Sequence, residues 1–572
     1  MKSTALLFLS FTSLTISSPA GHVVHRRQSS GAPTATTKNG TYVGVHSSPY
    51  NQDYFLGIPF AEPPLQDLRF RNPVSLNESW TETRPATRYA EECIGYGGDQ
   101  IGYEESEDCL YLNVVRPSGY ENESLPVAVW IHGGGFYQGG TPDLRYNLSF
   151  IVQNSVSINK PIIGMSIAYR LGPFGFLASN EVQASGQTNI GLRDQHLALQ
   201  WIQENIAGFG GDPSKVTIWG ESAGAASVGF HLTLYNGRDD KLFRAGIMES
   251  GNPVSYRGLS NASFFQDQYL DVVNSVGCGD TADSLECLRQ VPFEPLNAAL
   301  NNSDYTWFPY LDGDLNQRYG SQQLADGSFI KVPIISGANS DEGTSFSPKN
   351  VNTVDDLIED MTNPNITSVS IPASYVPSLL DAYPDIPSEG IPSAAEGLGN
   401  ITLPAPYGAE FRRSAAYFGD AVFIAARRYT CETWAANNLT AYCYRFNAIP
   451  AGIPWPVDVT HFQEVAFVFD NINGLGYATN PFRDKGESYS KLAGLMSRSW
   501  ASFVYDGQVD GWVGRDGFAF GNQTTVESWP KYELESPRDI VWDVNRTSFV
   551  EPDTLRAEGI KLINQYAEAY RR

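Results

Sequence analysis

The sequence is short of basic residues and of charge in general. It contains 39 Lys and Arg against 63 Asp and Glu, so the formal net charge is −24. A surface of this sign repels phosphate backbones and anionic membranes, which argues against nucleic acid as a partner. Only 18% of the 572 residues are charged and 42% are apolar. This balance excludes a disordered chain and allows a large buried core.

Motifs for metal and phosphate chemistry are also missing. No Cys-x-x-Cys or His-x-x-x-His spacing occurs, and no Gly-Lys-Ser/Thr follows the glycine run at 133–135. We therefore expect neither a metal ion nor an organic cofactor. The chain has only six cysteines, and six cysteines permit fifteen pairings. Pairing of neighbours is the simplest arrangement, and a closed loop of about fifteen residues contributes roughly 3 kcal/mol. The neighbouring pairs are Cys93/Cys109, Cys278/Cys287 and Cys431/Cys443.

Long apolar runs are absent apart from a short one at the N-terminus. Lys2 precedes an apolar segment over about 5–16, and small residues stand at Ser18 and Ala20. This pattern predicts a secretory signal over 1–20, because the run is too short to span a membrane. We expect a flexible lead-in over 21–36, with Arg26-Arg27 as a candidate dibasic cleavage site. The prediction is therefore a secreted, extracellular protein without a transmembrane anchor.

Eleven Asn-x-Ser/Thr sequons support this interpretation. Behind a signal peptide, such sequons mark surface loops that can carry N-glycans. The candidate asparagines are Asn39, Asn77, Asn122, Asn147, Asn261, Asn301, Asn365, Asn400, Asn438, Asn522 and Asn545.

Apolar strand-like runs alternate with helical patterns along the chain. The runs at 125–131, 161–170 and 331–339 are typical of buried strands, and 192–207 has apolar residues at helical spacing. Strands separated by helices predict a mainly parallel sheet with helices on both faces. Pro/Ser/Asn-rich stretches such as 347–405 resemble inserted loops and short helices. We predict one α/β domain over 37–572, with functional groups at the carboxyl ends of its strands.

The stretch VTIWGESAG, at 216–224, matches the pattern of a strand-to-helix elbow. The tip residue of such a turn is strained, and glycines two positions before and after it relieve the crowding. Gly220 and Gly224 stand at those positions around Ser222. Ser222 is therefore the candidate nucleophile.

A serine hydroxyl requires a base and an acid that orients the base. In this topology the chain order is serine, acid, histidine, and only His231 and His461 follow Ser222. His231 lies nine residues along the expected helix, about 13 Å away, so His461 remains as the base. The strand at 331–339 delivers Asp341 and Glu342 at its carboxyl end. The residues alone leave the choice between these two acids open.

The glycine run after the strand at 125–131 predicts an oxyanion hole. Consecutive glycines at 133–135 allow backbone N–H groups to approach one substrate oxygen closely. Together with the N–H of Ala223, they form a candidate cradle of three donors, each worth roughly 3 kcal/mol in the transition state.

The whole set of blocks resembles the type-B carboxylesterase family, which includes cholinesterases and Candida-type fungal lipases. FGGDPSKVTIWGESAG (209–224) is similar to the family's serine signature, and EDCLYLNV (107–114) to its second signature. HGGGF, AYRLGPFGFL and NIGLRDQ are similar to further family blocks. The resemblance spans nearly all of the mature chain and indicates a secreted fungal carboxylic ester hydrolase.

The resemblance implies an α/β-hydrolase fold with a large, mixed but mostly parallel sheet and long loop insertions. It also implies Ser222 as nucleophile, His461 as base and Glu342 as acid. The oxyanion donors that it implies are Gly134, Gly135 and Ala223. Two of the cysteine pairs, Cys93/Cys109 and Cys278/Cys287, resemble family disulfides. The pair Cys431/Cys443 has no obvious family match and rests on proximity and parity.

The loop between the first two cysteines bears on the choice of ester. In Candida-type lipases this loop is long and forms an amphipathic lid, whereas here fifteen residues include four glycines and five acids. The loop also lacks the tryptophan that stacks on choline in cholinesterases. We therefore favour a soluble, short- to medium-chain ester over an interfacial triacylglycerol substrate. A non-catalytic adhesion module of the same fold is the third alternative. A small-molecule ester is the expected partner, and for the oligomeric state, which the sequence does not reveal, a monomer is favoured.

Overall fold

The computed structural model describes residues 31–386, 389–391 and 403–572. The expected signal over 1–20, the lead-in up to residue 30 with Arg26-Arg27, and Asn400 lie outside this part. The first paired strand begins before residue 37, where we expected the domain to start. Strand β1 (Thr34–Thr36) pairs with β2 (Thr41–Val43) and buries Ala35, so backbone hydrogen bonds bring the end of the lead-in into the domain. A third strand, β5 (Thr83–Pro85), completes this small sheet.

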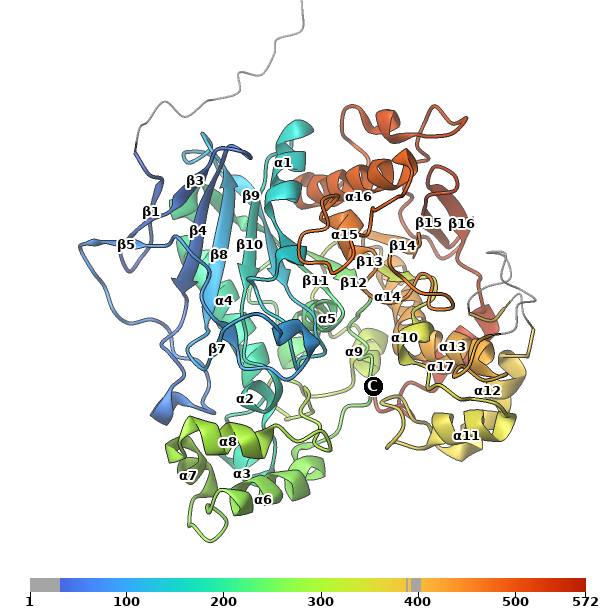
Figure 1. Cartoon of the computed structure of the whole chain (residues 1–572), viewed down its shortest axis with the longest axis horizontal. Helices are drawn as coiled ribbons and strands as arrows, with labels where there is room; N and C mark the ends of the chain where they lie inside the picture. The colour runs from blue at the N-terminus through green and yellow to red at the C-terminus, as the bar shows by residue number, and fades with distance from the viewer. Residues whose placement is uncertain (1–30, 387–388, 392–402) are drawn as a thin grey trace, which may run out of the picture.

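An eleven-stranded sheet forms the centre of the described chain (Figure 1). The six pairings from β10 through β9 to β15 are parallel, and those at both edges are antiparallel. This confirms the predicted, mostly parallel α/β sheet. In spatial order the strands are β16 (Phe549–Pro552), β15 (Arg538–Asp543), β14 (Ala441–Asn447), β13 (Ile334–Asn339), β12 (Ala245–Glu249), β11 (Gly211–Glu221), β9 (Leu125–Ile131), β10 (Ile163–Ile167), β8 (Tyr111–Pro117), β4 (Gln52–Pro59) and β3 (Val45–Ser47).

The central strand β9 is apolar throughout because both of its faces are covered. In β9, Val127 and Val129 belong to the core on one face, whereas Ala128 and Trp130 belong to the core on the other. The alternation follows from the two-residue period of a strand. Helices α4 (Ile190–Asn205), α5 (Ala223–Gly237) and α14 (Ala425–Ala436) cover the first face, and α1 (Ser149–Ser157) and α16 (Glu487–Asp506) cover the second.

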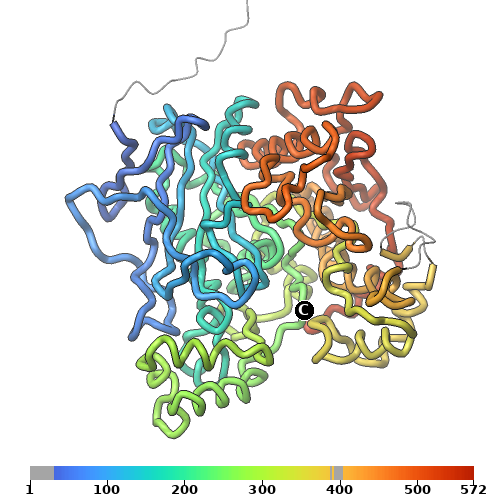
Figure 2. Tube along the Cα trace, viewed as in Figure 1, coloured from blue at the N-terminus to red at the C-terminus, as the bar shows by residue number. Residues whose placement is uncertain are grey.

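Two groups of helices project from the same end of the sheet (Figures 1 and 2). The first group, the α6–α8 lobe, consists of α6 (Gln266–Ser275), α7 (Ser284–Gln290) and α8 (Phe293–Leu300). The second, the α11–α13 lobe, consists of α11 (Val354–Thr362), α12 (Val376–Ala382), α13 (Phe411–Gly419) and α17 (Ala557–Gln565). The shorter helices are α2 (Gly172–Phe176), α3 (Asn180–Ser185), α9 (Gly320–Asp326), α10 (Gly343–Phe346) and α15 (Val465–Val468). None of the helices in the described ranges is both long and apolar enough to cross a bilayer.

Three disulfides join the neighbouring cysteines, with Cα–Cα distances of 5.0, 5.7 and 6.6 Å. They are Cys93–Cys109, Cys278–Cys287 and Cys431–Cys443. The third ties α14 to β14 and has no counterpart in the family resemblance.

The sequons differ in how far their amides are available. Both amide hydrogens of Asn39 donate to backbone carbonyls, of Leu76 at 3.1 Å and of Glu78 at 2.7 Å. Asn147 is half-buried, and its side-chain oxygen accepts from the N–H of Ser149 at 3.0 Å. The exposed asparagines are Asn77, Asn122, Asn261, Asn301, Asn365, Asn438, Asn522 and Asn545.

Candidate active site

Ser222 stands at a tight turn between β11 and α5. Its φ of 55° and ψ of −121° depart from both strand and helix, which is the conformation expected at an elbow tip. A Cβ on Gly220 would lie 2.4 Å from the carbonyl carbon of Gly224, and one on Gly224 would lie 2.0 Å from the oxygen of Ile131. Glycine is therefore required at both places. The N–H of Ser222 donates to the carbonyl of Glu249 at 2.8 Å, which fastens the turn to the end of β12.

The structure brings together Ser222, His461 and Glu342 in one relay. The hydroxyl of Ser222 lies 2.8 Å from Nε2 of His461, and Nδ1 of His461 lies 2.8 Å from Oε2 of Glu342. With the proton on Nδ1, the imidazole donates to Glu342 and accepts from Ser222. The three side chains come from the carboxyl ends of β11, β14 and β13, so the parallel sheet aligns residues that are far apart in sequence.

Of the two acids that sequence left open, only Glu342 faces the histidine. It is fully buried, and its other oxygen accepts from the hydroxyl of Ser250 at 2.5 Å and from the N–H of Asn339 at 2.9 Å. Asp341 instead accepts from the N–H of Val459 at 2.9 Å and so holds the segment that precedes His461. His231, which helical spacing had excluded, lies 3.1 Å from Gln195 in the core.

Two further buried carboxylates adjoin the relay, and sequence reasoning did not single them out. Oε1 of Glu221 lies 3.2 Å from Nε2 of His461. Glu464 is fully buried and accepts from the amide of Asn339 at 2.6 Å. The sequence feature that could have indicated them is their position next to the catalytic candidates: Glu221 precedes Ser222, and Glu464 follows His461 by three residues. Spacing on its own did not indicate that either carboxylate points at the site.

Burial and like charge control the protonation of this cluster. Burial raises the pKa of Glu221 well above its usual range, although the nearby His461 opposes this. Burial together with the charge of Glu342 raises the pKa of Glu464 to about 7. For His461, burial would lower the pKa, but the carboxylates of Glu221 and Glu342 overcome it and raise the pKa to about 9. The pocket is thus built to stabilise a charged imidazolium.

Aromatic rings hold the imidazole in place. Phe423 stacks on His461 with ring centres 4.8 Å apart and planes 6° apart, and Phe346 meets the same ring edge-on at 5.0 Å. Both phenyl rings limit rotation of the imidazole and shield it from water. Ser222 retains only 9% of its exposure, so this residue is largely shielded from water.

The glycine loop after β9 has positive φ angles at two of its residues, in a conformation that glycine adopts readily. Gly134 and Gly135 have φ values of 93° and 67°, which non-glycine residues rarely adopt. A Cβ on Gly133 would lie 3.2 Å from the Cβ of Ser222, so the loop borders the serine directly. In the part of the chain that the structure describes, no protein acceptor takes up the N–H groups of Gly134, Gly135 or Ala223.

The loop closed by Cys93–Cys109 packs on the glycine loop. Gln100 accepts from the N–H of Gly139 at 2.5 Å and donates to the carbonyl of Cys93 at 3.2 Å. Asp99 pairs with Arg145 at 2.6 Å on the same side. The large apolar side chain that this loop exposes is Ile101. These hydrogen bonds and this ion pair hold the loop in place next to the glycine loop.

Comparison with known proteins gives a consistent set of similarities. A model of the carboxylesterase family matches residues 31–548. The chain is 36% identical over 543 residues to Secreted lipase 1 of Botryotinia fuckeliana, covering 83% of this chain and 92% of that protein. It is 38% identical to Lipase 5 of Diutina rugosa, covering 70% and 77%. The crystal structure of Aspergillus niger EstA superposes with a TM-score of 0.78 at 27% identity, covering 95% of this chain and 99% of that one.

Proposed function

Since the chain belongs to the carboxylesterase family and is a serine hydrolase of carboxylic esters, we propose that it cleaves them through Ser222, His461 and Glu342. The observation that carries the assignment is the relay of two 2.8 Å contacts from Ser222 through His461 to Glu342. Gly134, Gly135 and Ala223 act as the oxyanion donors, which their unpaired N–H groups support.

The reaction proceeds in two steps through an acyl-enzyme. Oγ of Ser222 attacks the ester carbonyl carbon while its proton passes to Nε2 of His461. The three backbone N–H groups bind the oxyanion, and Glu342 stabilises the imidazolium. The bond to the alcohol oxygen then breaks, and that oxygen takes the proton from Nε2. Water gives a proton to Nε2 of His461 and attacks the acyl carbon. The bond from that carbon to Oγ of Ser222 then breaks, Oγ takes the proton back from Nε2, and the carboxylic acid leaves.

Soluble esters of short to medium chain are the substrates that we propose. The support is the loop between Cys93 and Cys109, which is short, rich in glycine and acidic residues, and held by the Gly139–Gln100 hydrogen bond and the Arg145–Asp99 ion pair. Interfacial triacylglycerol hydrolysis is the second candidate, because two of the relatives are named lipases. A chain-length series of p-nitrophenyl esters separates the two. We expect rates to fall for long acyl chains without a rise above the solubility limit; a jump at that limit would favour the lipase.

Ser222→Ala tests the nucleophile on p-nitrophenyl acetate. We expect the variant to lose about 10³-fold or more in kcat. The matched control is Ser490→Ala, an exposed serine on α16, which is expected to hydrolyse the ester at the wild-type rate. A fluorophosphonate probe followed by peptide mass spectrometry should label Ser222 alone. Equal rates for wild type and Ser222→Ala would refute the assignment and favour the non-catalytic module.

Secretion as a monomeric glycoprotein completes the proposal. The N-terminal pattern over 1–20 and a relative named as a secreted lipase support export. N-terminal sequencing of the protein from culture medium should begin after Ala20 or after Arg27. Glycopeptide analysis should find glycans on exposed sequons and an unmodified Asn39, whose two amide hydrogens are both used. Gel filtration at the monomer mass is the expected result for the oligomeric state.

A further inference from the structure

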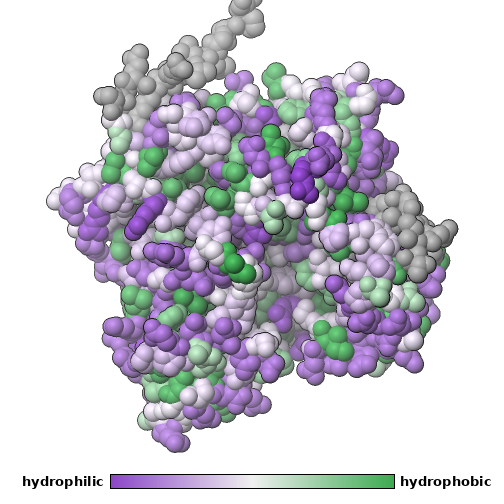
Figure 3. Space-filling model, viewed as in Figure 1, coloured by the Kyte–Doolittle hydropathy of each residue, from purple (hydrophilic) through white to green (hydrophobic). Residues whose placement is uncertain are grey.

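A cavity lies between the α6–α8 lobe and the α11–α13 lobe. It has a volume of about 500 Å³. Figure 3 shows the surface hollowed below its centre, where these two lobes face each other in Figure 1. Arg257, Phe308, Asp304 and Arg571 are among the residues that line it.

The two arginines of this cavity lack counter-ions. Within the described ranges, neither Arg257 nor Arg571 forms an ion pair with a carboxylate. Arg257 lies over the ring of Phe308, with its guanidinium carbon 4.6 Å from the ring centre, and Arg571 donates to the hydroxyl of Ser260 at 3.4 Å. Burial, and then the charge of Arg571, lower the pKa of Arg257. In a chain with a net charge of −24, two arginines that line one cavity and pair neither with Asp304, which lines it too, nor with another described carboxylate need a separate explanation.

Aromatic rings connect this cavity to the reacting centre. Phe308 meets Tyr256 edge-on at 5.4 Å, and Tyr256 contacts Phe423 at 5.5 Å. Phe423 is the ring that stacks on His461. Among the described residues, the buried hydroxyl of Tyr256 has no hydrogen-bond partner. Burial raises its pKa, the charge of Arg257 lowers it and that of Glu221 raises it. The rings of Phe308, Tyr256 and Phe423 therefore form a continuous row from Arg257 to the imidazole of His461.

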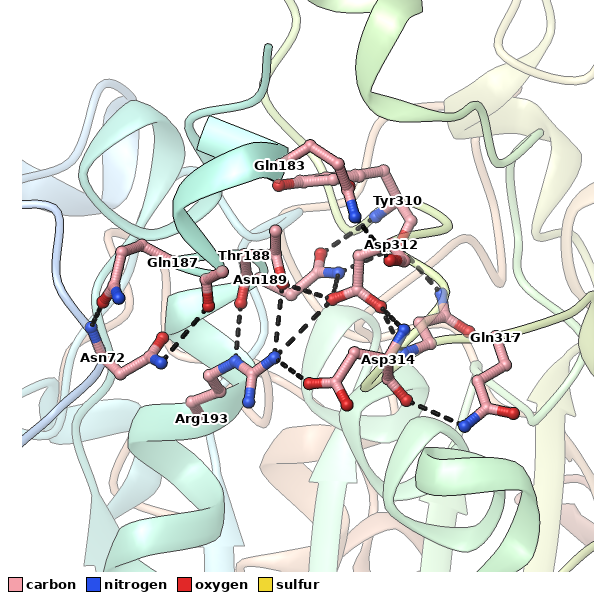
Figure 4. A network of polar contacts seen from close by, with 12 residues as sticks. Asn72, Gln183, Gln187, Thr188, Asn189, Arg193, Tyr310, Asp312, Asp314 and Gln317 are labelled. Atoms are coloured by element: carbon pink, nitrogen blue, oxygen red, sulfur yellow. Dashed lines mark hydrogen bonds and ion pairs between the residues drawn. The ribbon is translucent and has the colours of Figure 1, made fainter. Parts of the chain in front are cut away.

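The wall that carries Phe308 is held by a buried polar network (Figure 4). Asp312 accepts from the hydroxyl of Thr188 at 2.7 Å and from the amide of Asn189 at 2.8 Å. Asn189 also binds both backbone groups of Tyr310, at 2.9 and 3.0 Å. Tyr310 is two residues beyond Phe308, so the network fixes this segment to the start of α4. A ligand group in the cavity thus meets a preorganised surface.

We propose that the Arg257/Arg571 cleft binds an anionic group of the substrate, so that the preferred esters carry a carboxylate on their acyl or alcohol portion. This inference rests on the proposed function and deepens it. A guanidinium donates two parallel hydrogen bonds to a carboxylate, and such charge-assisted bonds strengthen when they are shielded from water. Arg257 and Arg571 are the residues that set this specificity, and they take no part in bond breaking.

The test compares matched pairs of esters on the wild-type enzyme. On the acyl side, mono-aryl esters of succinic to suberic acid are compared with the same esters whose free carboxyl is methylated. On the alcohol side, acetates of ω-hydroxy acids are compared with their primary amides. We expect one chain length at which the carboxylate ester exceeds its neutral partner in kcat/KM by about tenfold or more. The side that shows this preference identifies which portion of the ester enters the cleft.

Variants connect the preference to the two arginines. Arg257→Gln and Arg571→Gln should each reduce the carboxylate-to-neutral ratio toward one, mainly through KM, and Arg257→Lys should restore part of it. The matched control is Arg546→Gln, another arginine stacked on a phenyl ring, which should keep the wild-type ratio. Free glutarate should inhibit the wild type competitively and Arg257→Gln far less.

The outcomes separate this inference from the proposed function. If no carboxylate ester is preferred, or if both glutamine variants keep the preference, the anionic subsite is refuted while Ser222-dependent hydrolysis of p-nitrophenyl acetate still stands. If hydrolysis proves independent of Ser222, the proposed function fails first. Loss of folding in Arg257→Gln is detected by thermal melting, and in that case Arg571→Gln and glutarate inhibition decide the question.

Discussion

Replacing Gly134 with alanine should disable the oxyanion hole while leaving the fold in place. Gly134 has a φ of 93°, and an added Cβ would lie 2.1 Å from the backbone oxygen of Gln138. Backbone atoms cannot rotate away as the end of a flexible side chain does, so the turn from Gly134 to Gln138 must shift. This shift moves the N–H groups that point at the substrate oxygen.

The expected magnitude has two separable parts. Alanine at this φ costs roughly 1–2 kcal/mol of conformational strain, which lowers the free energy of unfolding. Displacing one oxyanion donor lowers kcat by about 100- to 1,000-fold, or about 2.7–4 kcal/mol of transition-state stabilisation. The first part depends on φ alone, whereas the second depends on the clash with Gln138.

Gly102 provides the matched control. Its φ of 97° is nearly the same, but an added Cβ meets nothing within 4 Å. Gly102→Ala should therefore show the strain in a thermal melt and a kcat near the wild-type value. Gly135→Ala, with φ 67° and open space around its Cβ, should fall between the two and act mainly through KM. The assay is kcat and KM on p-nitrophenyl acetate, with melting by circular dichroism. Equal losses of kcat in Gly134→Ala and Gly102→Ala would refute the reasoning.

Four further predictions concern the relay and the loop between Cys93 and Cys109. Activity requires the neutral form of His461, whose pKa is raised to about 9. In a plot of kcat/KM against pH, activity should therefore fall on acidification with a midpoint above 6.5, the ordinary pKa of histidine. A midpoint at or below 6.5 would contradict this. Glu221→Gln removes a carboxylate that favours the imidazolium, so the midpoint of this pH dependence should move to lower pH. An unchanged midpoint would show that Glu221 is uncharged in this pH range. Glu342→Gln should lower kcat by about 10⁴-fold. Asp341→Asn should lower it far less, because Asp341 accepts a hydrogen bond from the N–H of Val459. A larger loss in Asp341→Asn would show that Asp341, and not Glu342, orients the histidine. Gln100→Ala should lower kcat because it removes the acceptor of the Gly139 N–H. Ile101→Ala, on the same loop, is the control and should keep the wild-type rate. A wild-type rate for Gln100→Ala would show that this loop does not position the glycine loop.

Elements whose signal is local were predicted well from the sequence. The apolar run at 125–131 and the elbow at 216–224 depend on neighbouring residues, because burial on both sheet faces and glycine sterics act over a few positions. Ser222 and His461 followed from these patterns together with a count of histidines. The pairing of Thr34–Thr36 with β2, which precedes the expected edge of the domain at residue 37, was not predicted because this polar segment has no recognisable apolar pattern.

Side-chain direction at the ends of strands needed the folded chain. Asp341 and Glu342 are adjacent in sequence, yet one binds the backbone before His461 and the other binds its imidazole. The same limit applies to Glu221 and Glu464, whose approach to His461 depends on the register of β11 and on the loop after β14. The residue type of a carboxylate does not reveal whether it is solvated or buried against a partner.

The sequence by itself determined the chemistry available to this protein: a serine at a glycine-flanked elbow, one usable histidine, an acid and a glycine cradle. These are set by residue type and short-range sterics. The tertiary structure decided which acid orients the base, how the buried carboxylates raise the pKa of His461, and that Arg257 and Arg571 face one cavity. Coulomb energy and desolvation depend on distance and burial in three dimensions. Only packing of the sheet and its two lobes fixes those quantities.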